Sequence, residues 1–261
     1  MVKKKNSLRI LNVLMLLSVV GIIISGAVLV AENTAYTQGD TSYEAIRKLS
    51  PRATNIINDQ MELTPGSTIP EFDLAKLKVL NPDTVGWIWA EGTRIDYPIV
   101  QGKDNDYYLK HMFDGELNKV GAIFMDWRNG PDFSDKNTII YGHHMKDGSM
   151  FAALADFKDQ AAYEKKSEMI LFTQDGNYRI ELFAGNIVHG ETGRIPLSFD
   201  TDQEFKSYLA DVLKKSTFKS DVTILETDRI ITLATCTYEF NNARYLLFGR
   251  LVAVVPNGTA K

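Results

Sequence analysis

The chain has 261 residues, 44% of them hydrophobic and 24% charged, which is enough for one sizeable domain with appendages. Its formal net charge is −4, but the only charged residues before Glu32 are four bases: Lys3, Lys4, Lys5 and Arg9. Four of the 29 basic residues therefore lie at the N-terminus, which leaves 25 bases against 33 acids and a charge of −8. That balance argues against a nucleic-acid-binding protein, which needs a basic face, and a single cysteine excludes an internal disulfide.

The first predicted element is a membrane segment. Residues 10–31 carry no charge, and as a helix they would span roughly 33 Å, enough to cross a bilayer. The length of this run and the poor cleavage site that follows it favour an uncleaved signal anchor over a cleaved signal peptide or a buried core helix. Because the basic cluster precedes it, residues 1–31 are expected to form a cytoplasmic tail and transmembrane anchor, with residues 32–261 outside the cell.

Three short elements are predicted after the anchor. Residues 32–40 are polar and indicate a linker. The apolar spacing from residue 41 to about 60 indicates a short amphipathic helix that is ended or kinked at Pro51. After a loop, Asp73 is expected to cap a helix over residues 74–80, which the following Asn-Pro pair stops.

The rest of the chain is predicted to be mainly β structure. Nine segments are rich in β-branched and aromatic residues and are separated by turn residues: 85–92, 94–102, 121–128, 137–144, 168–174, 178–190, 221–227, 229–236 and 244–255. About eight or nine short strands without βαβ alternation predict a barrel or a sandwich. Two amphipathic helices, over residues 149–159 and Thr201–Lys215, are expected to pack on it, and Thr201 with Glu204 predicts a capping box.

The only cysteine, Cys236, ends an apolar strand, and Arg244 begins the next strand eight residues later. Between them, Glu239, Asn241 and Asn242 indicate a turn. Such a hairpin brings a thiol and a guanidinium to one end of a sheet, where a fixed positive charge favours a thiolate and stabilises an oxyanion. From these residues alone the alternatives stay open, because a lone cysteine is more often a small buried hydrophobe and a hairpin arginine more often a solvated charge.

A histidine pair, His143 and His144, follows the strand predicted over residues 137–141. A histidine after the end of a strand and after Gly142 is well placed to project into a cleft. A metal site is one alternative, but no Cys, Asp or Glu residues with zinc-ligand spacing accompany the pair, so we expect no metal. A surface histidine without a role is the other alternative.

Taken together, TLATC followed eight residues later by Arg244, with YGHHMKDGSMF upstream, closely resembles the class B sortases. These are membrane-anchored cysteine transpeptidases of Gram-positive bacteria. The resemblance covers roughly residues 72–255 and includes the helix before the cysteine strand. One departure is Ala234, where the family more often has the serine of TLSTC. The resemblance implies a closed sortase-type β-barrel of about eight strands, with N-terminal helices and a helix in the loop before the cysteine strand. With the elements predicted above, this divides the chain into the anchor, an extracellular linker and N-terminal helix over residues 32–70 and a catalytic domain over residues 71–261.

The resemblance further implies residue roles. Cys236 is expected to be the nucleophile, His143 the catalytic histidine, since it directly follows Tyr141-Gly142, and Arg244 the essential arginine. Three residues are expected to bind the substrate peptide: Asn105, Leu109 and Thr235.

The implied reaction cleaves a C-terminal sorting signal after Thr, forms a thioester at Cys236 and transfers the protein to an amine of peptidoglycan, without a cofactor. The expected partners are secreted proteins bearing the signal, a peptidoglycan precursor or cross-bridge amine, and the membrane through the N-terminal helix. Resemblance to class B favours NPxTx-like signals over LPxTG. The alternatives are a pilin-polymerising sortase that uses a lysine acceptor, a cysteine protease that uses water, and a non-catalytic membrane-anchored scaffold.

Overall fold

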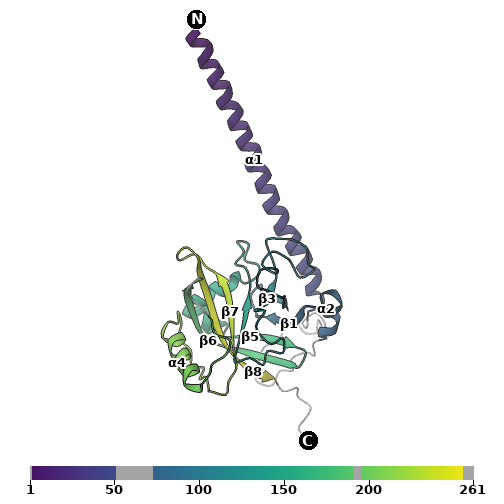
Figure 1. Cartoon of the computed structure of the whole chain (residues 1–261), viewed down its shortest axis with the longest axis vertical. Helices are drawn as coiled ribbons and strands as arrows, with labels where there is room; N and C mark the ends of the chain where they lie inside the picture. Colours follow the sequence, from purple (N-terminus) through teal and green to yellow (C-terminus); the bar gives the residue numbers. More distant parts are fainter. Residues whose placement is uncertain (1, 51–72, 191–194, 255–261) are drawn as a thin grey trace. The chain divides into compact units, whose positions relative to one another are not determined.

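The computed structural model describes residues 2–50, 73–190 and 195–254. The chain divides into two compact units, residues 1–42 and residues 43–261. Helix α1 (Val2–Arg47) makes up the first unit and continues into the second (Figure 1). From Asn12 onward α1 is long and apolar enough to cross a bilayer, and its apolar stretch is not buried. A secretory signal sequence has the same character.

Residues 32–40, predicted to be a polar linker, are helical, because α1 runs through this segment. Its threonines satisfy their hydroxyls within the helix, since Thr34 donates to the Val30 carbonyl at 2.8 Å and Thr37 to the Asn33 carbonyl at 3.0 Å. Threonine side chains that bond back one turn can remain in a helix despite their preference for turns. Of the amphipathic helix predicted between 41 and 60, the part up to Arg47 is helical, and residues 51–60 lie outside the described ranges.

The second unit begins with the last turns of α1. Tyr43 is buried, its hydroxyl donates to the Gly121 carbonyl at 2.7 Å, and its ring meets Tyr97 edge-on at 5.2 Å. Arg47 lies over the Tyr97 ring at 4.8 Å and donates to the Asp96 carbonyl. The compact body therefore takes in residues from Tyr43 onward, whereas we expected the catalytic domain to start at residue 71.

The body is a closed barrel, as predicted, and its strand order is β1-β2-β3-β4-β7-β8-β6-β5. Its strands in the described ranges are β1 (Thr84–Trp89), β2 (Asp96–Val100), β3 (Ile123–Met125), β4 (Asn137–Tyr141), β5 (Glu168–Thr173), β6 (Gly176–His189), β7 (Ile230–Cys236) and β8 (Ala243–Val254). The β2–β3 and β4–β7 pairs are parallel and the other pairs antiparallel. Each of the described strands is therefore paired on both sides, which protects its edges from pairing with another chain.

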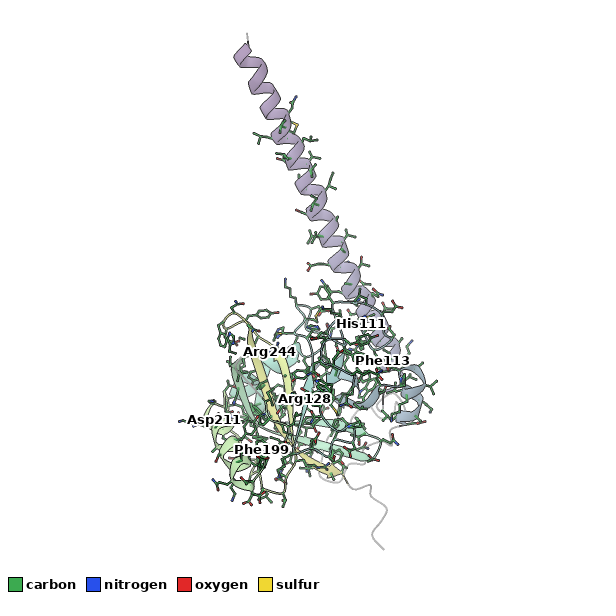
Figure 2. The ribbon with its side chains drawn as sticks, in the orientation of Figure 1. His111, Phe113, Arg128, Phe199, Asp211 and Arg244 are labelled. Carbon is green, nitrogen blue, oxygen red and sulfur yellow. The ribbon has the colours of Figure 1, made fainter. Side chains whose placement is uncertain are left out.

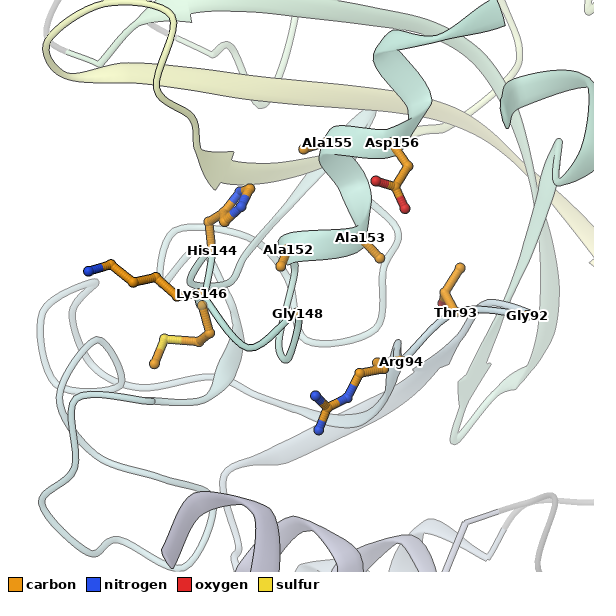
Figure 3. Close-up of a pocket in the computed structure, with 11 residues that line it drawn as sticks. Gly92, Thr93, Arg94, His144, Lys146, Gly148, Ala152, Ala153, Ala155 and Asp156 are labelled. Carbon is orange, nitrogen blue, oxygen red and sulfur yellow. The ribbon is translucent and has the colours of Figure 1, made fainter. Parts of the chain in front are cut away.

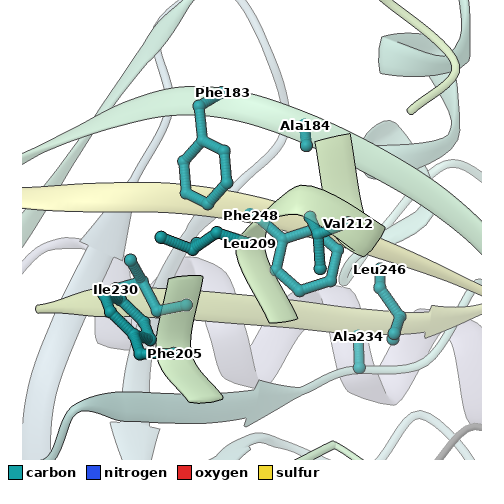
Figure 4. Close-up of a cluster of buried hydrophobic side chains, with 9 residues drawn as sticks. All are labelled: Phe183, Ala184, Phe205, Leu209, Val212, Ile230, Ala234, Leu246 and Phe248. Carbon is teal, nitrogen blue, oxygen red and sulfur yellow. The ribbon is translucent and has the colours of Figure 1, made fainter. Parts of the chain in front are cut away.

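Helix α4 (Asp202–Lys214) covers one outer face of the barrel, as expected of the helix before the cysteine strand (Figure 4). It contributes three residues to a buried cluster, Phe205, Leu209 and Val212, which meet six from the strands: Phe183, Ala184, Ile230, Ala234, Leu246 and Phe248. The predicted capping box is half correct. The Thr201 hydroxyl accepts from the Glu204 amide at 3.2 Å, but the Glu204 carboxylate reaches the Asp200 amide at 2.9 Å and not that of Thr201.

Three further elements refine the prediction. Helix α2 (Leu74–Leu80) is capped by Asp73, as expected. Residues 149–159 contain a 3-10 helix, η2 (Ala152–Lys158), followed by α3 (Gln160–Lys165). Three-residue spacing of buried side chains suits a 3-10 helix, in which residues i and i+3 eclipse.

The strand predicted over residues 221–227 is absent from the structure, because its would-be neighbour β7 is already paired on both sides with β4 and β8. Val222 and Ile224 pack against the α4 cluster instead.

Candidate active site

Three adjacent strands, β4, β7 and β8, bring the candidate residues to one rim of the barrel. Cys236, the last residue of β7, is the cross-strand partner of Arg244 in β8, so the predicted hairpin is confirmed. On the other side of β7, the parallel register with β4 ends at the Tyr141–Ala234 pair. The Gly142 amide extends this pairing by donating to the Ala234 carbonyl at 3.1 Å. His143 is two residues past Tyr141 and Cys236 two past Ala234, so both emerge at the same rim.

The turn between β7 and β8 presents the thiol to solvent and holds the guanidinium inward. Cys236 is exposed, and Asn242 adopts a left-handed φ of 58°, which asparagine tolerates better than most residues. The Gly190 amide donates to the Asn242 carbonyl at 2.9 Å. A Cβ on Gly190 would lie 2.6 Å from Asn242 Oδ1 and 2.7 Å from Arg244 Nε, so a larger residue here would displace these side chains. Arg244 Nε is buried and meets no acceptor among the described residues.

The ring of His143 is fixed through one nitrogen. Its Nε2 lies 2.7 Å from the Leu109 carbonyl oxygen. A carbonyl oxygen can only accept, so Nε2 carries a proton and donates it, and Nδ1 is the nitrogen left for exchange with a neighbouring group. Leu109, expected to contact substrate, thus also orients the histidine through its backbone.

A pocket of about 330 Å³ opens beside this rim. Its lining comes from the loop before β3, from β3, β4, β6, β7 and β8 and from the segments that follow β3 and β6: Asn105, Asp106, Leu109, Phe124, Arg128, Tyr141, Val188, Gly190, Ile195, Ala234, Arg244 and Leu246. Figure 2 labels the two arginines of this lining, Arg128 and Arg244. The pocket therefore combines apolar side chains with two guanidinium groups.

One buried carboxylate, Asp126, organises the polar part of the lining. It is fully buried and accepts from Arg128 through Nε at 2.8 Å and Nη2 at 2.7 Å, from the Tyr141 hydroxyl at 3.0 Å and from Asn105 Nδ2 at 3.1 Å. Burial alone would raise the pKa of Asp126, but these hydrogen bonds, those of Arg128 foremost, outweigh it and hold the pKa below its ordinary value. Burial, together with the Asp126 charge, raises the pKa of Tyr141. The phenol is therefore a hydrogen-bond donor at neutral pH.

The structure places the three residues expected to bind peptide in different surroundings. Asn105 and Leu109 both line the pocket. However, both ends of the Asn105 amide are engaged within the protein, because its Oδ1 accepts from the Trp127 amide at 3.0 Å while its Nδ2 donates to Asp126. Thr235 is buried and does not line the pocket. Strand alternation explains this, since Ala234 and Cys236 share one face of β7 and Thr235 points to the other.

Sequence reasoning missed the roles of Asp126, Arg128 and Tyr141 in this pocket. A usable signal was present, because Asp126 comes directly after the wholly buried strand β3, and a charged residue there must find partners.

A second, more open cavity of about 730 Å³ lies on the side of His144 (Figure 3). Its walls come from the β1–β2 turn, the 144–148 loop and η2: Gly92, Thr93, Arg94, His144, Met145, Lys146, Gly148, Ala152, Ala153, Ala155 and Asp156. Arg94 joins two of these walls by donating to the Asp147 carbonyl at 2.7 Å. Among the described residues no residue lines both cavities; the first includes Arg244, the cross-strand partner of Cys236, and the second includes His144, the neighbour of His143.

Known proteins are similar to this chain in sequence and in fold. Residues 88–252 match the Sortase domain family. The Sortase B of Listeria monocytogenes serovar 1/2a is 42% identical over 182 residues, which are 69% of this chain and 74% of that protein. A Staphylococcus aureus sortase B–substrate complex has a TM-score of 0.74 at 30% identity, over 85% of this chain and 100% of that one. A sortase B complexed with triglycine has a TM-score of 0.73 at 32% identity, over 84% and 99%. The chain therefore belongs to the sortase family, as a class B sortase, and is a cysteine transpeptidase.

Proposed function

We propose that this transpeptidase cleaves a C-terminal sorting signal after threonine, holds the protein as a thioester on Cys236 and passes it to an amine of peptidoglycan. The observation that carries the proposal is the pairing of Cys236 with Arg244, next to the strand end that delivers His143. Acyl transfer needs a nucleophile, a proton carrier and an oxyanion donor, which Cys236, His143 and Arg244 would supply.

In the first half-reaction the Cys236 thiolate attacks the threonine carbonyl carbon. Arg244 donates hydrogen bonds to the oxygen on which negative charge develops, and this oxygen supplies the acceptor that its buried Nε lacks among the described residues. His143 then gives the proton on Nδ1 to the departing amine, the C–N bond breaks and the thioester remains. The Leu109 carbonyl keeps Nε2 occupied and so aims Nδ1 at the reacting groups.

In the second half-reaction an amine attacks the thioester, and His143 Nδ1 takes a proton from it as the C–S bond breaks. The new amide replaces the old one, so no cofactor or nucleotide is needed. The relative solved with triglycine and the relative solved with its substrate support this pair of reactants for the present chain. The pocket beside Arg244 would take the sorting peptide, with Asn105, Leu109 and Arg128 in its lining.

The apolar stretch of α1 supports attachment to the cell membrane. Residues 1–31 would form a cytoplasmic tail and anchor, and residues 32–261 would lie outside the cell, as the N-terminal bases favour. Tethering would keep the enzyme where its substrates emerge and raise their effective concentration.

The test uses the full-length chain in detergent micelles with fluorogenic NPxTx-like and LPxTG-like peptides, with and without triglycine. Cys236→Ala, His143→Ala and Arg244→Ala should each lower cleavage by at least about 10³-fold, while His144→Ala, the matched neighbour, keeps activity within about tenfold. A peptide–triglycine conjugate establishes the transfer. Cleavage without a conjugate points to water as acceptor, and a lysine-bearing pilin peptide tests the polymerase alternative. Full activity of Cys236→Ala would refute the proposal.

A further inference from the structure

The 3-10 helix η2 is joined at its start to the segment that carries His143. The Phe151 amide, directly before η2, donates to the His143 carbonyl at 2.9 Å. The Phe151 ring is fully buried against Gly142, where a Cβ would lie 2.7 Å from its ring atoms. The backbone of the histidine is therefore fixed to the start of η2.

At its other end, η2 is joined to the turn that follows Cys236. Lys158, the last residue of η2, donates to the Thr237 hydroxyl and forms an ion pair with Glu239. The Thr237 hydroxyl in turn donates to the same carboxylate at 2.6 Å. Lys158 also lies over the Tyr245 ring, 5.5 Å from its centroid. The three polar groups form a closed triangle that is anchored on η2.

The sheet itself does not supply this connection. The β4–β7 register ends at Tyr141 and Ala234, and the Gly142 amide makes the last backbone hydrogen bond between these two strands in the described residues. Beyond that point, no strand pairing in the described residues joins His143 to Cys236, and the direct contact between their segments is that of Tyr238, whose hydroxyl donates to the His144 carbonyl at 3.4 Å and whose ring meets His144 edge-on at 5.2 Å. A seven-residue 3-10 helix is a short rod of about 14 Å, and it runs from one of these segments to the other.

We propose that η2 is a brace that sets the separation of His143 and Cys236, with Lys158 and Glu239 as positioning residues for acyl transfer. This inference rests on the proposed roles of His143 and Cys236. The two side chains are 25% and 34% exposed, so their ion pair is shielded more than a surface pair. Neither lines the pocket for the sorting peptide, which separates positioning from substrate binding.

The expected signature is a loss of kcat without a change in KM. Lys158→Met keeps the buried stem but removes every polar contact, and should lower kcat by about 10- to 100-fold, the effect of misplacing reacting groups by about 1 Å. Glu239→Gln keeps the shape and should lower kcat about tenfold. KM for the sorting peptide should stay within about twofold in both. Lys158→Arg, which restores the charge and donors, should return kcat to within about threefold of wild type.

A double-mutant cycle tests whether the two residues act as one unit. Because the brace is already broken in Lys158→Met, adding Glu239→Gln should lower kcat by less than about twofold more. Lys165→Met on α3 and Glu116→Gln are matched exposed controls and should behave like wild type. All variants are compared as full-length protein in micelles, well below their melting temperatures, which are measured in parallel.

Two results would overturn the brace. One is wild-type kcat in Lys158→Met and Glu239→Gln, even with a lowered melting temperature, because that marks a purely structural contact. The other is a multiplicative loss in the double variant. Failure of the proposed function would give a different result, because Cys236→Ala would then remain active. If Cys236→Ala is inactive while Lys158→Met keeps the wild-type kcat, only the brace is rejected and the proposed function stands.

Discussion

Replacing Asp126 with asparagine tests how the peptide pocket is held together. The Oδ2 atom of Asp126 accepts from three donors: Arg128 Nη2, the Tyr141 hydroxyl and Asn105 Nδ2. The Oδ1 atom accepts from Arg128 Nε at 2.8 Å and from the Arg128 amide at 3.0 Å. Asparagine keeps one oxygen and turns the other position into an NH₂ group. Whichever way the amide faces, at least two donors then meet a donor.

The size of the loss follows from this count. Hydrogen bonds to charged groups contribute about 1.5–3 kcal/mol each, and breaking a buried ion pair by removing one partner costs about 3–5 kcal/mol. The Arg128 side chain is 43% exposed and regains water when its partner is lost, whereas Asp126 is fully buried. Discounting for that hydration, we expect the free energy of unfolding to fall by about 2–4 kcal/mol.

The functional effect should appear mainly in KM. Asn105, Arg128 and Tyr141 all line the pocket and all bond to Asp126, so its replacement loosens the wall without touching Cys236 or His143. Urea unfolding of full-length protein in micelles gives the stability change, and peptide kinetics give KM and kcat. Asp132→Asn, the same change at an exposed carboxylate, should cost less than about 0.5 kcal/mol. A loss under about 1 kcal/mol with an unchanged KM would refute the reasoning.

Three further predictions concern the surroundings of the site. Burial acts to raise the pKa of Glu239, but hydrogen bonds from Lys158 and Thr237 outweigh it and lower this pKa to about 2. A depressed carboxyl pKa stabilises the fold above about pH 4.5 and loses this effect as the pH falls toward about 2, so acid titration of Glu239→Gln should lack that component. Gly190→Ala should displace Arg244 and lower kcat/KM by about 10- to 100-fold with little loss of stability, and unchanged kinetics would contradict the close approach. Phe205→Ala should lower the free energy of unfolding by about 3–5 kcal/mol while kcat stays near wild type; a loss below about 1 kcal/mol would mean that α4 barely packs on the barrel.

The local sequence pattern predicted those parts of the site whose residues lie close together along the chain. An apolar strand, a turn of Glu and Asn residues and a second strand indicated the hairpin, and its register does pair Cys236 with Arg244. The helix over 201–215 followed from its apolar spacing and its threonine cap. In each case the contacts span a few residues, so propensity and periodicity carry the information.

The parts that the local pattern could not settle depend on partners far along the chain. Nothing local could show that residues 221–227 find no free strand edge, because that requires knowing that β7 lies between β4 and β8. Thr235 was expected in the peptide site, but which face of β7 meets the pocket depends on the register of the whole barrel. The bonds around Asp126 likewise join loops and strands that only the fold brings together.

The candidate residues lie at or beyond the ends of strands, which explains why both the family motif and the fold were needed to identify the site. Cys236 ends β7, His143 lies beyond the end of β4 and Arg244 stands near the start of β8. Because His143 lies past its ladder, it can turn its side chain toward a substrate, but it forfeits the hydrogen bonds that would fix its distance from Cys236. Contacts outside the sheet must then supply that precision. Among the described residues such contacts include the Leu109 carbonyl on His143, Gly190 against Arg244, the Tyr238 hydroxyl on the His144 carbonyl, and η2 between the segments of His143 and Cys236. If that reasoning holds, variants of these supports should change kcat/KM more than they change stability, the reverse of what Phe205→Ala should do.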